Sequence, residues 1–349
     1  MSGILFPARI EIKRADPVIP ILPVGLTKFF AVGTQVVTVR SMHDTVSVDG
    51  HTVHRWRLGP SVFTALPQAG ARLMEWTVGL AGQGSRPVLH WPRDADLDNP
   101  ARVRGGNPIL FPFAGRTFHK GKENHWRPPG GRAVLPMPRH GFARDGAFAL
   151  VHCDDRGFAA TLEPTEADQA AYPYAYRFTV GYTFEDLMLT VDFTLENAGD
   201  TPIPWSAGHH FYFAIPWHAD LDRSAYVLNL PQGKAVRHAP DGSLVKADGG
   251  PLAPTLDDPE LVDRIHTRLK ASHVTVGPRG GEEDLTLRWH HSGGDRKHLS
   301  LVTWTSGPEA PFYCIEPWMG PPNAAEHHRG LHFVQPGDQA TYSVEVSLL

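Results

Sequence analysis

The sequence predicts an all-β fold of short, mostly antiparallel strands, with few and short helices. Apolar and polar residues alternate from Tyr176 to Phe184 and again from Leu187 to Leu195. Two alternating runs with a short polar break between them are typical of an antiparallel hairpin with one buried face. The same alternation returns from Leu285 to Trp289 and from Tyr342 to Leu348. In addition, 34 Gly and 32 Pro in 349 residues supply the many turns that a chain of short strands needs.

Helical patterns are rare, and one segment carries the clearest of them. Asp258 and Pro259 have the residue types of a helix cap and first helical position, and Leu261, Ile265 and Leu269 follow at helical spacing. We therefore predict one short helix there. The largely polar stretch from Asp220 to Pro259 is interpreted as long loops at the rim of the sheets, where binding residues often lie.

Composition limits the possible functions. The length suits one large all-β domain or two ordinary domains, and 41% hydrophobic residues suffice for a large core. A net charge of −4 argues against a nucleic-acid partner, whose binding surface would be basic. Lys and Arg form no polybasic run, so a membrane partner is not expected either. The sequence gives no indication of the oligomeric state.

The two cysteines and the N-terminus indicate a cytoplasmic protein. Cys153 and Cys314 are too few to staple a domain of this size, and no CxxC metal motif occurs, so both are interpreted as reduced thiols. The apolar stretch from Val18 to Val32 is interrupted by prolines, a glycine and Lys28 and has no small-residue cleavage site, so we predict no signal peptide. No other run approaches the length of a transmembrane helix.

Four short motifs carry most of the chemical information. Each places charged or acid–base side chains among glycines and aromatic residues. They are Gly105 to Arg116, Arg139 to Arg144, Gly208 to Phe213 and Cys314 to Trp318. Together they are suited to holding a sugar, because aromatic faces stack on the apolar face of a pyranose while Arg, His and Glu bond its hydroxyls.

In this order the four motifs resemble those of the aldose 1-epimerase (galactose mutarotase) family, over roughly residues 50 to 349. The resemblance implies a galactose mutarotase-like β-supersandwich, which periodicity alone would not separate from a jelly roll. We therefore expect an N-terminal extension of residues 1–45, which shows no such match, and a catalytic sandwich of residues 46–349.

The resemblance also implies a reaction, the interconversion of the α and β anomers of a free aldohexose. A base removes the proton from the C1 hydroxyl while an acid protonates the ring oxygen. The ring opens, the C1–C2 bond rotates, and the ring closes on the other face. The chemistry needs a carboxylate and an imidazole with suitable pKa values. The expected partner is a small-molecule sugar, and no cofactor is expected.

Glu316 is the candidate general base. It lies in the apolar run from Tyr313 to Trp318, which would desolvate the carboxyl group and raise its pKa. The resemblance implies a catalytic base at the Glu of Glu-Pro-Trp. A buried structural ion pair is the alternative.

His210 is the candidate general acid. The family pattern of His, any residue, Tyr and Phe fits His210 to Phe213, whereas His209 falls one position too early. Adjacent strand residues face opposite sides of a sheet, so only one of the two histidines can point into the site. Tyr212 lies on the side of His210 and is expected to bind substrate by lining the sugar pocket. A satisfied core histidine is the alternative.

The resemblance gives His140 a bond to the sugar ring oxygen, and Gly141 would permit a close backbone approach or an unusual dihedral there. A turn histidine is the alternative.

The remaining residues are candidates for substrate binding. Arg116 would hold hydroxyls with its planar fork of donors, and Asp263 is the nearest match to the Asp with which the family anchors hydroxyls. Trp318 is a stacking platform or a core residue, and Arg144 binds substrate or pairs with a carboxylate. Asn107, between Gly106 and Pro108, is interpreted as a turn residue.

No metal site is expected from the sequence. The densest group among the 20 histidines, His327, His328 and His332, has no cysteine nearby and follows no ligand pattern.

Three other functions are weighed against a free-sugar epimerase. A hexose-6-phosphate 1-epimerase of the same fold would need cations around a phosphate, which Arg104, Arg139 and Arg144 could supply. A non-catalytic carbohydrate-binding protein predicts loss of the Glu or the His, and both are retained. A glycoside-cleaving enzyme normally needs two catalytic carboxylates, and only Glu316 stands in a convincing motif.

Overall fold

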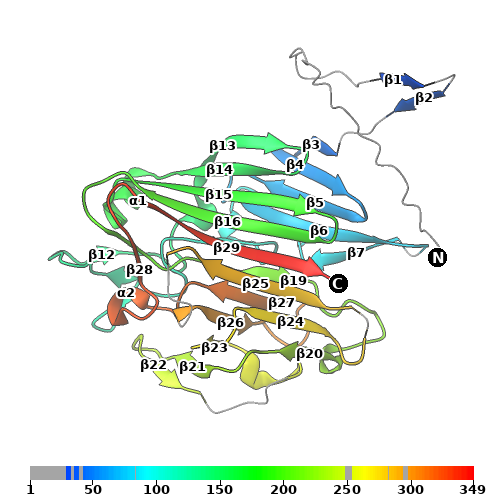
Figure 1. The fold of residues 1–349 in the computed structure, drawn as a ribbon. Helices are drawn as coiled ribbons and strands as arrows, with labels where there is room; N and C mark the ends of the chain where they lie inside the picture. Colours follow the sequence, from blue (N-terminus) through cyan, green and yellow to red (C-terminus); the bar gives the residue numbers. More distant parts are fainter. Residues whose placement is uncertain are drawn as a thin grey trace, which may run out of the picture. The chain divides into compact units, whose positions relative to one another are not determined.

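The computed structural model describes residues 29–32, 35–38, 42–82, 84–247, 254–281, 283–293 and 298–349, and it confirms the all-β class (Figure 1). The chain divides into two units, Met1–Ser41 and Met42–Leu349. In the first unit, β1 (Phe29–Val32) pairs antiparallel with β2 (Gln35–Thr38). Most of the apolar stretch considered above as a leader lies outside the described residues. Among the described residues, no helix is long and apolar enough to cross a membrane.

The second unit is built around two antiparallel sheets. The smaller sheet has the strand order β13-β14-β15-β16-β29-β25-β24-β20. Its strands are β13 (Ala147–Asp154), β14 (Gly157–Glu163), β15 (Tyr176–Glu185), β16 (Met188–Asn197), β29 (Gln339–Leu348), β25 (Leu285–His291), β24 (His273–Pro278) and β20 (Tyr226–Asn229).

The larger sheet has the order β22-β21-β23-β26-β27-β19-β7-β6-β5-β4-β3, with β18 joining β27 to β8. Its strands are β3 (His43–Val48), β4 (His51–Leu58), β5 (Ser61–Leu66), β6 (Arg72–Leu80), β7 (Gly84–Leu89), β8 (Ile109–Leu110), β18 (Gly208–His209), β19 (Phe211–Phe213), β21 (Lys234–His238), β22 (Leu244–Lys246), β23 (Arg264–Thr267), β26 (Ser300–Trp304) and β27 (Tyr313–Trp318).

Several short elements lie outside the two sheets. Three further antiparallel pairs are β9 (Phe118–His119) with β10 (Lys122–Glu123), β11 (His125–Trp126) with β12 (Leu135–Pro136), and β17 (Ile203–Trp205) with β28 (His332–Val334). The α-helices are α1 (Glu166–Ala171) and α2 (Ala324–His327). Single 3-10 turns are η1 (Pro100–Arg102), η2 (Ala143–Asp145), η3 (Arg223–Ala225) and η4 (Pro259–Leu261).

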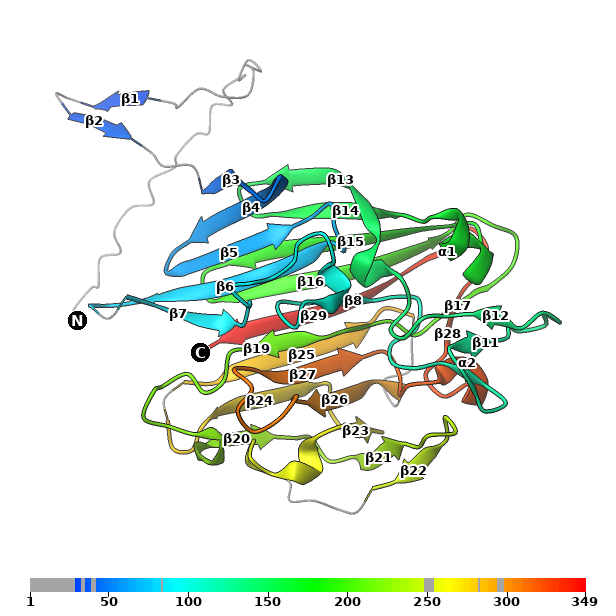
Figure 2. The same cartoon turned by 180° about the vertical axis from the view of Figure 1, so that it is seen from behind.

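The two sheets pack face to face over one hydrophobic core, as the alternation predicts (Figures 1 and 2). The predicted hairpin is β15 paired with β16, and its inward residues are buried. Aromatic rings join the layers: Phe184 of β15 stacks on Phe63 of β5, with ring centroids 4.4 Å apart. Because side chains alternate along every strand, the residues that face the core also determine which residues of the larger sheet point away from it.

Two local predictions are wrong. Asp258 does cap a helical turn, since its Oδ1 accepts from the backbone N–H of Glu260 at 2.9 Å, but only η4 forms. The chain then extends into β23, where pairing with β21 and β26 outweighs the weak helical spacing.

The segment from Asp220 to Pro259 is not only loops, because it contributes β20, β21 and β22; residues 248–253 are not described.

Candidate active site

The motif side chains gather on the face of the larger sheet that points away from the core. β27 lies between β26 and the β18–β19 segment (Figure 2). Along β27, Tyr313 and Ile315 belong to the main core, whereas Cys314 and Trp318 belong to small clusters outside it. Every second residue of a strand points to the same face, so Glu316 lies on the same face as Cys314 and Trp318.

The two adjacent histidines point to opposite sides of the sheet. His209 is fully buried in the core, and its ring stacks on Phe193 with centroids 4.1 Å apart. His210 points outward, and its ring lies nearly parallel to that of Tyr212 at 4.7 Å. His210 and Tyr212 are therefore on the face of Glu316, and His209 is not.

His210 and Glu316 approach each other across the β19–β27 pair. His210 Nε2 lies 3.6 Å from Glu316 Oε1, and the side chains are 13% and 2% exposed. The Sγ of Cys314 joins them, with the three ligand-type atoms all within 4.8 Å of one another. Glu316 Oε2 and His210 Nδ1 are buried without a partner among the described residues. Unsatisfied buried polar atoms of this kind are uncommon and are often found at functional sites.

Burial drives both groups toward their neutral forms. Burial raises the pKa of Glu316 well above its usual value, and the nearby charge of Asp263 raises it further. Burial also lowers the pKa of His210 to about 3, with the charge of Arg72 acting in the same direction. The pair therefore carries a single proton over a wide range of pH.

His140 lies beside this pair, in a left-handed backbone conformation that is followed by Gly141. Its φ is +67° and that of Gly141 is +71°, and a Cβ on Gly141 would lie 1.9 Å from the carbonyl oxygen of Phe111, so only glycine fits there. His140 Nδ1 accepts from the N–H of Gly115 at 3.1 Å. Burial lowers the pKa of His140 well below its ordinary value, so the neutral ring carries its proton on Nε2. The ring centroids of His140 and His210 are 5.6 Å apart.

Asn107 has a role that the sequence did not reveal. It is fully buried. Its amide nitrogen lies 3.0 Å from His209 Nδ1 and from the Tyr182 hydroxyl, and its oxygen accepts from the N–H of His210 at 3.2 Å. Asn107 thus fixes the backbone between β18 and β19 at the point where the two histidines diverge.

Arg72 is a second buried residue near the site that the sequence did not reveal. Its side chain is buried at the start of β6, where it donates to the carbonyl oxygens of Gly105 and Pro100. Burial lowers the pKa of this guanidinium to about 10, which leaves it charged at neutral pH. The only signal in the sequence is an arginine at the head of an apolar strand.

The candidate binding residues differ in their contacts and in the groups on which their charges act. Arg144 is half-buried, and its charge acts on both His140 and His210. Asp263 is exposed at φ +54°, and its charge acts on Glu316. Arg116 instead faces Glu123, at 3.7 Å, and the Phe118 ring, although its charge still acts on His140.

Trp318 and Trp304 both lie near the pair, but they differ in how much of the ring is accessible. Trp318 is 4% exposed, packs against Gly208 and donates to the His209 carbonyl at 3.1 Å, so most of its ring is committed to packing. Trp304 is half-buried and meets the His210 ring edge-on at 5.8 Å. It is the more accessible aromatic ring beside the pair, and the sequence alone did not single it out.

Comparisons with known proteins identify the family of the chain. Residues 62–347 match the aldose 1-epimerase family model. The chain therefore belongs to the aldose 1-epimerase family.

Relatives and solved structures add detail. An Escherichia coli protein named "Putative glucose-6-phosphate 1-epimerase" is 26% identical over 251 residues, covering 71% of this chain and 72% of that protein. A galactose mutarotase-like protein from Clostridium acetobutylicum superposes with a TM-score of 0.71 at 14% identity, covering 88% of this chain and 98% of that one. A Synechocystis protein superposes with a TM-score of 0.67 at 23% identity, covering 89% of this chain and 96% of that one. These structures establish the galactose mutarotase-like sandwich fold.

Proposed function

We propose that this protein interconverts the α and β anomers of an aldohexose by acid–base catalysis through the open-chain sugar. The observation that carries the proposal is the buried contact between His210 and Glu316, 3.6 Å apart. One carboxyl and one imidazole within reach of the same C1 centre are the groups that the reaction requires.

A single shared proton is sufficient for the chemistry. In the reactive arrangement Glu316 is a carboxylate and takes the proton of the C1 hydroxyl, while His210 is protonated and gives its proton to the ring oxygen. In this arrangement the pair holds one titratable proton, on His210. The neutral pair that burial favours also holds one, on Glu316. Proton transfer between the two groups converts one arrangement into the other. Ring closure reverses both transfers, so the enzyme returns to its starting state without a co-reactant.

His140 would assist at the ring oxygen. Because Gly115 donates to its Nδ1, the Nε2–H is the donor available to a substrate. A neutral donor at this position stabilises the oxygen as its bond to C1 breaks, without competing with His210 for the proton. Trp304 and Tyr212 would pack against the sugar.

A hexose 6-phosphate is the second candidate substrate, and two observations favour it. The E. coli relative is named for glucose 6-phosphate. In addition, the charges of Arg104, Arg139 and Arg144 act on groups of the site, and none of the three forms an ion pair with a residue that the structure describes. Surplus cations favour an anionic substrate. Rates with a sugar and its 6-phosphate, measured side by side, distinguish the two.

The pH profile tests the shared-proton mechanism. The pKa of His210 lies near 3 and that of Glu316 is raised well above 4.5, so the pair gains a second proton only in strong acid. We expect kcat/KM per folded molecule not to fall on the acid side with a midpoint near pH 6.5, the ordinary value for histidine. The measurement is the anomerisation rate from about pH 5 to about pH 8, with folding followed by circular dichroism. An acid-side fall with its midpoint near 6.5 would contradict the shared-proton mechanism, because the pair would then gain its second proton near neutral pH.

A further inference from the structure

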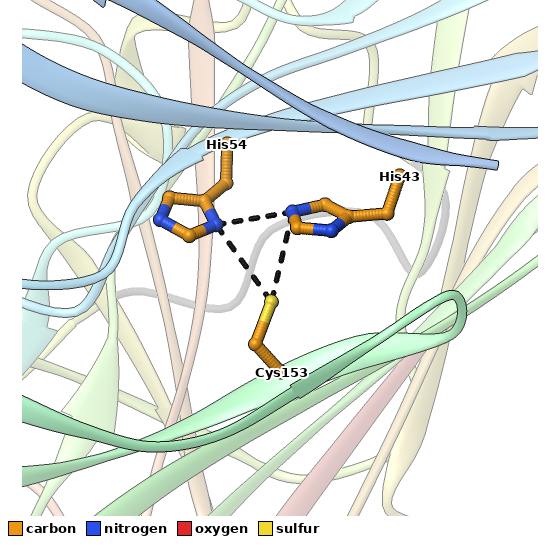
Figure 3. Close-up of side chains that lie close together, drawn as sticks. All are labelled: His43, His54 and Cys153. Carbon is orange, nitrogen blue, oxygen red and sulfur yellow. Dashed lines mark hydrogen bonds between the residues drawn. The ribbon is translucent and has the colours of Figure 1, made fainter. Parts of the chain in front are cut away.

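A second group of chemically active side chains lies far from the candidate active site. His43, His54 and Cys153 converge between the two sheets, and β5, β6 and β7 separate them from the strands that carry His210 and Glu316. Figure 3 shows the two ring nitrogens and the sulfur turned toward one another. The proposed reaction uses none of these residues, so their arrangement has another cause.

The distances fit the ligand shell of a zinc ion. His43 Nε2 and His54 Nδ1 are 3.1 Å apart, and Cys153 Sγ lies 3.6 Å from the first and 3.7 Å from the second. With Zn–N of about 2.0–2.1 Å and Zn–S of about 2.3 Å, tetrahedral geometry places ligand nitrogens ~3.4 Å apart and nitrogen and sulfur ~3.6 Å apart. The three atoms therefore already occupy three corners of such a site.

Strand register accounts for the two histidines. β3 and β4 pair with His43 opposite Trp56 and Thr45 opposite His54. The two histidines are thus diagonal neighbours on one face. Trp56 supports them, since its ring stacks on His43 at 4.8 Å and on His54 at 5.8 Å.

A β-bulge accounts for the cysteine. The register of β13 against β14 shifts between Leu150 and His152. Without the shift, His152 would share the inward face of Leu150, but with it Cys153 points inward and His152 is exposed. Trp56 Nε1 also donates to the carbonyl of Asp154 at 2.8 Å, which holds the end of β13 against β4.

The surroundings favour a cation. The charges of Asp155, Asp44 and Asp154 all act on His43. By contrast, two of the histidines considered in the sequence bond to backbone carbonyls: His327 to that of Pro322 and His332 to that of Met319.

We propose that His43, His54 and Cys153 bind one zinc ion, with water as the fourth ligand. On binding, the Cys153 thiol gives its proton to solvent and the thiolate forms the Zn–S bond; no redox change occurs. β3 and β13 are the edge strands of the larger and smaller sheets (Figures 1 and 2). The ion would therefore clip the two sheet edges together and close a loop of 99 residues between His54 and Cys153.

The test is metal binding by the full-length chain after chelation and dialysis. We expect one equivalent of Zn²⁺ per chain, a higher Tm with zinc than without, and with Co²⁺ the intense visible bands and the near-ultraviolet thiolate band of a tetrahedral site. Cys153→Ser should weaken Zn²⁺ binding by about 100-fold or more and remove the thiolate band. His54→Gln should also weaken binding, which covers the case in which the serine variant does not fold.

Two matched variants serve as controls. His152→Ala removes the adjacent exposed histidine, and Cys314→Ser removes the thiol of the other group; both should still bind one equivalent. Absence of stoichiometric binding in the parent chain would leave the three residues as a hydrogen-bonded cluster and overturn the proposal. Equal binding by Cys153→Ser, or loss only in Cys314→Ser, would do the same. None of these readouts depends on anomerisation, so the zinc site and the proposed activity are tested separately.

Discussion

Glu316→Gln is expected to reduce anomerisation at least about 1,000-fold while leaving the fold intact, in the upper part of the range for a general base. Gln has the same shape, but its amide cannot accept the proton of the C1 hydroxyl. Glu316 is 2% exposed, and burial already favours its neutral, protonated form, so a neutral amide of the same shape changes little in the buried site. The free energy of unfolding should therefore be nearly unchanged.

The measurement is the anomerisation rate together with urea unfolding of the same preparation. Glu75→Gln is the matched control, because burial also raises the pKa of Glu75, which lies on β6 and has no part in the proposed reaction. A near-parental rate for Glu316→Gln would exclude this residue as the base. Loss of the fold would instead indicate a structural ion pair.

His210→Asn and His209→Asn should have opposite effects, although the two residues are adjacent. His210→Asn removes the proposed acid, so the rate should fall by about two to four orders of magnitude with little change in stability. His209 is fully buried against Phe193. His209→Asn should therefore lower the free energy of unfolding by about 2 kcal/mol, as disruption of a packed core site does, and change the rate per folded molecule far less.

Rates for both variants are to be divided by the folded fraction from unfolding curves. If His209→Asn proved the slower enzyme on that scale, the assignment of faces along β18 and β19 would be wrong. The inference that Tyr212 lines the sugar site would then fail as well.

Sequence patterns were most informative where alternation is strict. The β15–β16 hairpin, β25 and β29 could be predicted because apolar residues repeat at every second position against a single core. The opposite orientations of His209 and His210 follow from the same rule. The helix predicted after Asp258 failed because three residues at helical spacing cannot compete with strand pairing on both sides of β23.

The missed residues depend on contacts between distant segments. Asn107 has turn residues on both sides, and its buried role becomes visible only when Tyr182 and His209 are brought to it. Arg72 is stabilised by carbonyl groups about 30 residues away. The His43, His54 and Cys153 cluster has no spacing motif, because strand register and a bulge create it.

Polarimetry of freshly dissolved α-glucose, α-galactose and their 6-phosphates tests the central claim most directly. The chain is measured with a chelator present, at a temperature at which circular dichroism shows it folded without metal. The account predicts that optical rotation of at least one of these sugars reaches equilibrium faster than in buffer alone, and that Glu316→Gln removes the acceleration. If the folded chain accelerates none of them, the acid–base assignment is contradicted and a non-catalytic sugar-binding protein becomes the better description.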